Sequence, residues 1–276
     1  MPPFESINHA MTALATGGFS VTSDSFASYG PAIVLFTILP MATGATSFAL
    51  HRKFLDGDWK KLFKSSEFKL MAALILLATF ILALRMDWIT ALFTTASAST
   101  TVGFSNINVI GGPAWGSLEK SIVSLLMIIG GGYGSTAGAI KLIRTVMVLT
   151  ALYWLVKKAL MPDRAVVPLK INGKVFSESE VLQSAVFIFA YLVLLAIGTL
   201  ITMTVLPEAS AINCFFDSAS AQGTVGLTSG ITGPSMPAVL KVTYIIQMWI
   251  GRLEVIPVVA LFANFIGATP RHHDPF

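Results

Sequence analysis

Charged residues, potential metal ligands and cysteine are all scarce in this sequence. Asp, Glu, Lys and Arg make up 12% of its 276 residues, whereas soluble domains carry about 25%. The hydrophobic fraction is 54%. These values exclude an ordinary soluble domain and predict an all-α integral membrane protein, because backbone in lipid must satisfy its own hydrogen bonds.

The scarcity of reactive side chains also limits the possible functions. The single cysteine, Cys214, rules out a framework of intrachain disulfides. With four histidines and scattered carboxylates, the sequence shows no nucleophile–base pair and no set of metal ligands at membrane depth. We therefore expect a protein that is not an enzyme and that holds no tightly bound cofactor.

A five-residue pattern occurs three times: Thr, any residue, Gly, a large apolar residue, then Ser or Thr. The copies are Thr16-Gly17-Gly18-Phe19-Ser20, Thr101-Val102-Gly103-Phe104-Ser105 and Thr224-Val225-Gly226-Leu227-Thr228. Each copy follows a partly apolar stretch of about a dozen residues, at 4–15, 89–99 and 211–222, which is too short to span a bilayer. A single copy of so short a pattern is common in proteins and predicts nothing, but three copies in equivalent places indicate an internal repeat.

Each repeat predicts a half-helix that re-enters the membrane and ends in a filter loop. Non-helical backbone at membrane depth is tolerated only where it lines a water-filled cavity or is buried in protein. The glycine permits the left-handed angles that aim carbonyls inward, and carbonyls can replace the water shell of a cation. The three loops contain no carboxylate, which suits potassium held by the backbone alone.

The distribution of charge predicts the orientation. Of the 18 Lys and Arg residues, 14 lie in segments 52–69 and 141–174 or at Arg271, so this side is assigned to the cytoplasm. Six acids then lie on the outer side: Glu5, Asp24, Asp87, Glu119, Glu208 and Asp217. They form either an acidic mouth that concentrates cations or solvated helix caps, and the sequence leaves both readings open.

Two further features lie within apolar runs. The run from Gly130 to Gly138 is followed by Lys141 but completes no Gly-Lys-Ser/Thr nucleotide motif, so it is either a flexible kink or a functional loop. Arg252 and Glu254 lie in the last apolar run, where ionisable residues by default mark function. Residues two apart do not share a helix face, so we favour Arg252 facing the pore and Glu254 bonding within the bundle.

These motifs resemble those of the Trk/Ktr/HKT superfamily of potassium transporters, specifically the membrane subunit of bacterial Trk-type uptake systems. The resemblance lies in residues 9–20, 130–144 and 251–255 and extends over essentially the whole chain. It implies four helix–pore helix–helix units around one pore with pseudo-fourfold symmetry. The first unit and the opening helix of the second are not found, so we expect this chain to be a C-terminal portion.

The resemblance also implies the organisation of the chain. The expected parts are a second pore unit without its first helix (1–50), a basic cytoplasmic loop (51–69), a third pore unit with an intramembrane glycine loop (70–156), a cytoplasmic loop (157–180), a fourth pore unit (181–265) and a cytoplasmic tail (266–276). The expected location is the cytoplasmic, or inner, membrane, crossed several times. The expected partners are membrane lipid, a second copy of the subunit, a nucleotide-binding cytoplasmic ring and the missing N-terminal pore unit, but no nucleic acid.

The predicted function is potassium uptake, with K⁺ as the transported ion. The predicted filter residues are Thr16, Gly17, Gly18, Phe19, Thr101, Val102, Gly103, Phe104, Thr224, Val225, Gly226 and Leu227. The resemblance implies that the glycine run is an intramembrane gating loop, and the gate residues expected on this basis are Gly130, Gly131, Gly132, Gly134, Ser135, Thr136, Gly138, Lys141 and Arg252. A sodium- or proton-coupled symporter is the alternative; it is less favoured because the sequence offers no cluster of buried acids as a proton relay.

Overall fold

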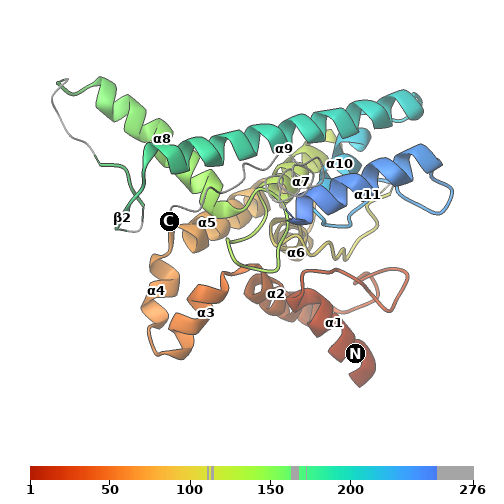
Figure 1. Cartoon of the computed structure of the whole chain (residues 1–276). Coiled ribbons are helices and arrows are strands. Elements are labelled where there is room, and N and C mark those ends of the chain that lie inside the picture. The colour runs from red at the N-terminus through yellow and green to blue at the C-terminus, as the bar shows by residue number, and fades with distance from the viewer. Residues whose placement is uncertain (111, 113–114, 163–167, 172, 254–276) are drawn as a thin grey trace, which may run out of the picture.

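The computed structural model describes residues 1–110, 112, 115–162, 168–171 and 173–253 (Figure 1). The helices are α1 (Pro3–Leu14), α2 (Pro31–Ala45), α3 (Phe48–Leu55), α4 (Trp59–Lys64), α5 (Ser66–Leu82), α6 (Trp88–Ser99), α7 (Ser117–Ile129), α8 (Leu142–Ala159), α9 (Glu178–Val205), α10 (Ala211–Gln222) and α11 (Ala238–Leu253). The strands β1 (Lys170–Ile171) and β2 (Lys174–Val175) form a small antiparallel hairpin. In the described part, the other regular elements are all helices, joined by loops.

Three short helices of twelve residues each lie among the longer ones. Helix α1 packs on α2, α6 packs between α5 and α7, and α10 packs between α9 and α11. Contacts of α6 with α2, and of α10 with α7, join the three groups. Each short helix ends just before one Thr-x-Gly sequence, so the fold brings the three repeats toward a common centre.

Two apolar clusters hold this centre in place. The larger lies among α5, α6, α7, α9 and α10 and includes Leu82, Val123, Met127, Tyr191 and Phe216. The other joins α1 and α2 to α6 and includes Phe26, Phe93 and Phe104. Phe104, from the second repeat, is fully buried against Phe26 with ring centroids 4.6 Å apart. The core thus extends up to the repeats and fixes the second one rigidly.

Helix α9 can cross a membrane by its own length and composition. It has 28 residues and therefore extends about 42 Å at 1.5 Å per residue. Only a third of its most apolar window is buried in the protein. Its outer face carries the exposed side chains Leu182, Val186, Phe189, Leu192, Ile197 and Leu200. This apolar surface suits contact with lipid.

Helices α2 and α3 pass the same test only as a pair, bent by 104°. The sequence predicts one spanning helix over 33–50, bent at Pro40 and Gly44, but the helix continues through Pro40 and breaks after Ala45. Thr46 is extended, with φ −89° and ψ 142°. Because the helix ends there, the carbonyl of Gly44 accepts from the N–H of Thr136, and the carbonyl of Ala45 accepts from the N–H of Gly132. The position of the bend is therefore set by a distant loop rather than by the proline.

Candidate functional site

The three Thr-x-Gly loops share one backbone conformation. The φ angles are 50° at Thr16, 57° at Thr101 and 55° at Thr224, then 67° at Gly18, 86° at Gly103 and 98° at Gly226. In each loop the residue between Thr and Gly donates its N–H to the carbonyl five positions earlier, at 2.8, 3.0 and 2.9 Å. The left-handed glycines were predicted. The left-handed threonines were not, because a β-branched residue rarely adopts that conformation.

The loops contact one another in order around the centre. A Cβ added to Gly18 would lie 1.8 Å from the carbonyl oxygen of Val102, and one added to Gly103 would lie 1.8 Å from that of Val225. At Gly226 no described atom beyond its neighbours would lie within 4 Å of a Cβ. The first loop therefore packs on the second and the second on the third, while the third has an open side.

The glycine-rich loop, residues 130–138, lies against the threonines of all three repeats. The hydroxyl of Thr16 donates to the carbonyl of Thr136 at 2.7 Å. The N–H of Gly138 donates to the hydroxyl of Thr101 at 2.9 Å. A Cβ on Gly138 would lie 2.3 Å from the hydroxyl oxygen of Thr224. The structure thus brings together the predicted filter and gate segments, which are far apart in sequence.

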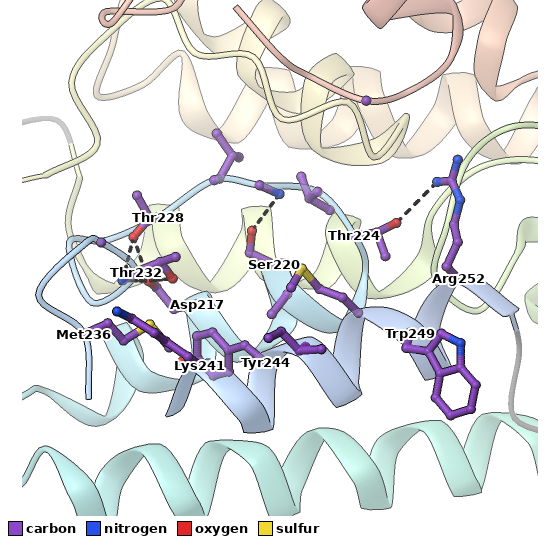
Figure 2. Close-up of a pocket in the computed structure, with 18 of the residues that line it drawn as sticks. Asp217, Ser220, Thr224, Thr228, Thr232, Met236, Lys241, Tyr244, Trp249 and Arg252 are labelled. Carbon is purple, nitrogen blue, oxygen red and sulfur yellow. Dashed lines mark hydrogen bonds between the residues drawn. The ribbon is translucent and has the colours of Figure 1, made fainter. Parts of the chain in front are cut away.

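Two basic residues border this region in different ways. Lys141 is buried, and its ammonium group donates to the carbonyl of Ala137 within the glycine-rich loop. A guanidinium N–H of Arg252 donates to the hydroxyl of Thr224 at 3.4 Å, as Figure 2 shows. Arg252 is thus beside a predicted filter residue, whereas Lys141 helps to shape the loop. Glu254 lies outside the described residues.

An open cavity of about 830 Å³ adjoins the first and third loops (Figure 2). Thr16, Gly17 and Phe19 line one side of it, and α10, α11 and the third loop line the other. Phe19 is 76% exposed, whereas Phe104 at the equivalent position is buried. The cavity therefore lies on the open side of the third loop, where a Cβ on Gly226 would meet no described atom within 4 Å.

Two residues, each nine positions before the glycine of the first or the third repeat, support those loops from behind, and neither was among the predicted filter or gate residues. His9 is buried, its Nε2 lies 2.9 Å from the hydroxyl of Ser20, and its Nδ1 donates to the carbonyl of Glu5 at 2.8 Å. Asp217 occupies the same position in the third repeat and accepts from the hydroxyl of Thr228 at 2.7 Å. The shared spacing to the Ser or Thr after the filter glycine is the signal that could have found both.

Asp217 makes the larger set of contacts. Its carboxylate also accepts from N–H and hydroxyl groups of Ser229 (2.6 and 2.7 Å) and Thr232 (3.0 and 2.9 Å). It is 1% exposed, so it is neither part of an open acidic mouth nor a solvated cap. Glu119, another of the outer acids, is 2% exposed and pairs with Arg85 at 3.4 Å. Asp87 does cap α6.

Replacing Asp217 by Asn is expected to destabilise the third loop. The amide loses the charge and turns one acceptor into a donor that faces two or three other donors, which costs about 3 kcal/mol. The apparent melting temperature of the purified protein should fall by roughly 5–10 °C, measured by thermal unfolding in detergent. Asp87→Asn is the matched control, since that exposed cap should cost about 1 kcal/mol or less. Equal melting temperatures for the two variants would contradict this role of Asp217.

Comparison with known proteins identifies the family. A family model described as TrkH, a cation transport protein, matches residues 1–84 and 86–267. The chain belongs to the TrkH family. This confirms the resemblance to Trk-type potassium transporters and the all-α membrane fold.

The TrkH relatives include proteins from bacteria and archaea. The chain is 30% identical over 288 residues to the Trk system potassium uptake protein TrkH of Vibrio parahaemolyticus, covering 95% of the chain and 56% of that protein. It is 31% identical over 270 residues to an uncharacterized cation transporter of Methanocaldococcus jannaschii, covering 97% of the chain and 55% of that protein. The chain thus spans a little over half the length of these relatives.

A solved TrkH structure has the same fold. The crystal structure of the potassium transporter TrkH from Vibrio parahaemolyticus superposes with a TM-score of 0.82 at 26% identity. The match covers 95% of this chain and 58% of that one. The relatives from Vibrio parahaemolyticus and Bacillus subtilis are both named as potassium uptake proteins.

Proposed function

We propose that this chain forms most of the wall of a pathway for potassium uptake across the cytoplasmic membrane. The observation that carries the proposal is the packing of three equivalent Thr-x-Gly loops on one another, with a glycine-rich loop against their threonines. Alternating left-handed residues in each loop leave carbonyl groups available to replace the hydration shell of a cation. The names of the Trk and Ktr relatives support potassium as that cation.

The proposed gate is the glycine-rich loop together with Arg252. Because the loop is bonded to Thr16 and Thr101, an ion leaving the filter meets it at once. Residues 130–138 must move or reshape for the ion to pass. The five glycines among these nine residues make such a change of backbone angles inexpensive.

The fourth wall of the filter is proposed to come from polypeptide outside these 276 residues. The open side at Gly226, the adjoining cavity and the 55–56% coverage of the relatives support this. The proposed pore units remain 1–50, 70–156 and 181–265, joined on the cytoplasmic side by 51–69 and 157–180, with a tail at 266–276. Of these, residues 111, 113–114, 163–167, 172 and 254–276 lie outside the described part.

The proposed partners follow from the family and from the membrane setting. They are a second copy of the subunit, a nucleotide-binding regulatory ring at the basic cytoplasmic segments, and lipid around the bundle. The Trk and Ktr names of the relatives support an assembled uptake system.

Rubidium uptake tests this function. Full-length protein in liposomes loaded with potassium should accumulate ⁸⁶Rb⁺ down its electrochemical gradient. Uptake should proceed without a sodium or proton gradient, because no described site holds the cluster of buried acids that a proton relay would need. Uptake that strictly required either gradient would replace the proposal with the symporter, and the absence of uptake under both conditions would refute a potassium pathway.

A further inference from the structure

Helices α3 and α4 form a hairpin, residues 48–64, that lies at one corner of the molecule (Figure 1). Neither helix contributes a buried residue. Large apolar side chains on the hairpin are exposed: Phe48 59%, Phe54 54%, Leu55 84%, Trp59 53% and Phe63 55%. Within the described part of the chain, most of this apolar surface has no protein cover.

Basic residues accompany this apolar surface. At about 100° per residue, Trp59, Leu62 and Phe63 share one face of α4, and Lys60, Lys61 and Lys64 share the opposite face. Helix α3 adds Arg52 and Lys53 in its last turn. The acids of the hairpin are Asp56 and Asp58, and Asp58 pairs with Lys61. Five basic residues against two acids leave the hairpin positively charged.

The hairpin is tied to the membrane region at both ends. Helix α3 begins three residues after the end of α2 and is turned from it by 104°. Helix α5 begins two residues after the end of α4. With lengths of about 12 Å for α3 and about 9 Å for α4, the hairpin stays close to the ends of two apolar helices. That is the level at which hydrocarbon gives way to lipid headgroups.

The same hairpin is bonded to the glycine-rich loop. The N–H of Phe48, the first residue of α3, donates to the carbonyl of Gly134 at 2.9 Å. On the other side of the hairpin, Glu67 in the first turn of α5 accepts from the N–H of Tyr133 at 3.4 Å. A displacement of α3 and α4 would therefore be transmitted directly to residues 133 and 134.

We propose that the α3–α4 hairpin binds anionic lipid headgroups and that this binding sets the position of the glycine-rich loop. Lysines contact the phosphates while Trp59, Phe63 and Leu55 enter the boundary of the acyl chains, as in other interfacial amphipathic helices. Lipid is favoured over a protein because the apolar side chains lie at the level of the membrane that surrounds α2 and α5. The lipid-binding step stands alone, whereas its effect on the loop rests on the gate role proposed above.

Lipid binding is tested with the full-length protein and three hairpin lysines that form no ion pair with any described residue. In the variant Lys53→Gln/Lys60→Gln/Lys64→Gln, affinity for phosphatidylglycerol, measured by native mass spectrometry, should fall by roughly 100-fold, at about fivefold per lysine. The matched control is Lys157→Gln/Lys170→Gln/Lys174→Gln, which removes three exposed lysines from the other basic segment. Equal affinities of the two variants would overturn the binding site. The lipid site would also be overturned if the hairpin variant kept its affinity for lipid but bound a purified nucleotide-binding ring subunit more weakly. That result would identify the partner of the hairpin as a protein.

Transmission to the loop is tested by a substitution that removes one N–H. Phe48→Pro deletes the donor to Gly134 but is compatible with the fold, because proline is favoured at the first position of a helix. Ser47 before it has φ −54° and ψ 131°, close to the polyproline conformation that a residue before proline prefers. The control Phe48→Ala removes the same exposed ring and keeps the donor. ⁸⁶Rb⁺ uptake by wild type and Phe48→Ala should rise severalfold as phosphatidylglycerol replaces phosphatidylcholine, and uptake by Phe48→Pro should not.

The outcomes separate the two proposals. An equal lipid response in Phe48→Pro and Phe48→Ala would overturn the transmission, even with lipid binding intact. A wild-type protein without uptake in any lipid would refute the potassium pathway, and the lipid titration by mass spectrometry would still decide the binding site.

Discussion

Replacing Gly103 by Ala is expected to remove most of the preference for potassium over sodium. A Cβ at this position would lie 1.8 Å from the carbonyl oxygen of Val225, and the φ of 86° is itself strained for any L side chain. The second and third loops must then separate, and the carbonyl groups that would surround the ion must move. We expect the selectivity to fall by about tenfold or more, equivalent to about 1.4 kcal/mol, measured as the ratio of ⁸⁶Rb⁺ to ²²Na⁺ uptake into liposomes.

Gly57→Ala is the matched control for this prediction. Gly57 has a nearly identical φ of 88°, but a Cβ there would meet no described atom within 4 Å. It therefore carries the backbone strain without the collision and should leave selectivity unchanged. An unchanged uptake ratio in Gly103→Ala would contradict the filter assignment. A loss in Gly226→Ala beyond that in Gly57→Ala would indicate a wall supplied from outside this chain, because the described structure leaves room at Gly226.

Local sequence patterns predicted the elements around the filter closely. The third half-helix was expected at 211–222 and is found at Ala211–Gln222, and the second was expected at 89–99 and is found at Trp88–Ser99. Small residues and short apolar stretches determine these boundaries locally. The recurrence of glycine after Thr-x likewise predicted the positive φ angles, because only the backbone of glycine adopts them freely.

The tertiary features of the site could not be predicted in the same way. The left-handed threonines contradict the preference of their residue type, and they persist because the glycine-rich loop and Arg252 engage their hydroxyls. The break after Ala45 depends on hydrogen bonds from residues 132 and 136. The sequence predicted Asp217 only as one of the acids on the outer side. The five groups that donate hydrogen bonds to its carboxylate lie in a loop 11 to 15 positions later. Each of these features depends on contacts between residues far apart in sequence or in a later loop, which a pattern within one short segment does not predict.

Replacing Arg252 by Ala is expected to raise the rate of ⁸⁶Rb⁺ uptake by about tenfold or more. The guanidinium lies at the hydroxyl of Thr224, a residue that also adjoins Gly138 of the glycine-rich loop. A cation passing about 6 Å from this charge is disfavoured by about 3 kcal/mol at an effective dielectric constant of about 20. Removing the charge lowers that barrier, and water and counterions would offset part of the gain.

Arg252→Lys distinguishes the charge from the shape of the side chain. Lysine retains the positive charge but lacks the planar guanidinium, so uptake should remain close to that of the wild type if the barrier is electrostatic. If Arg252 instead serves only to hold Thr224 in its left-handed conformation, both variants should lose selectivity without gaining rate, and their melting temperatures should fall together. If Arg252→Ala is fast, selective and stable while Arg252→Lys remains slow, the barrier to the ion is the positive charge of residue 252 beside Thr224.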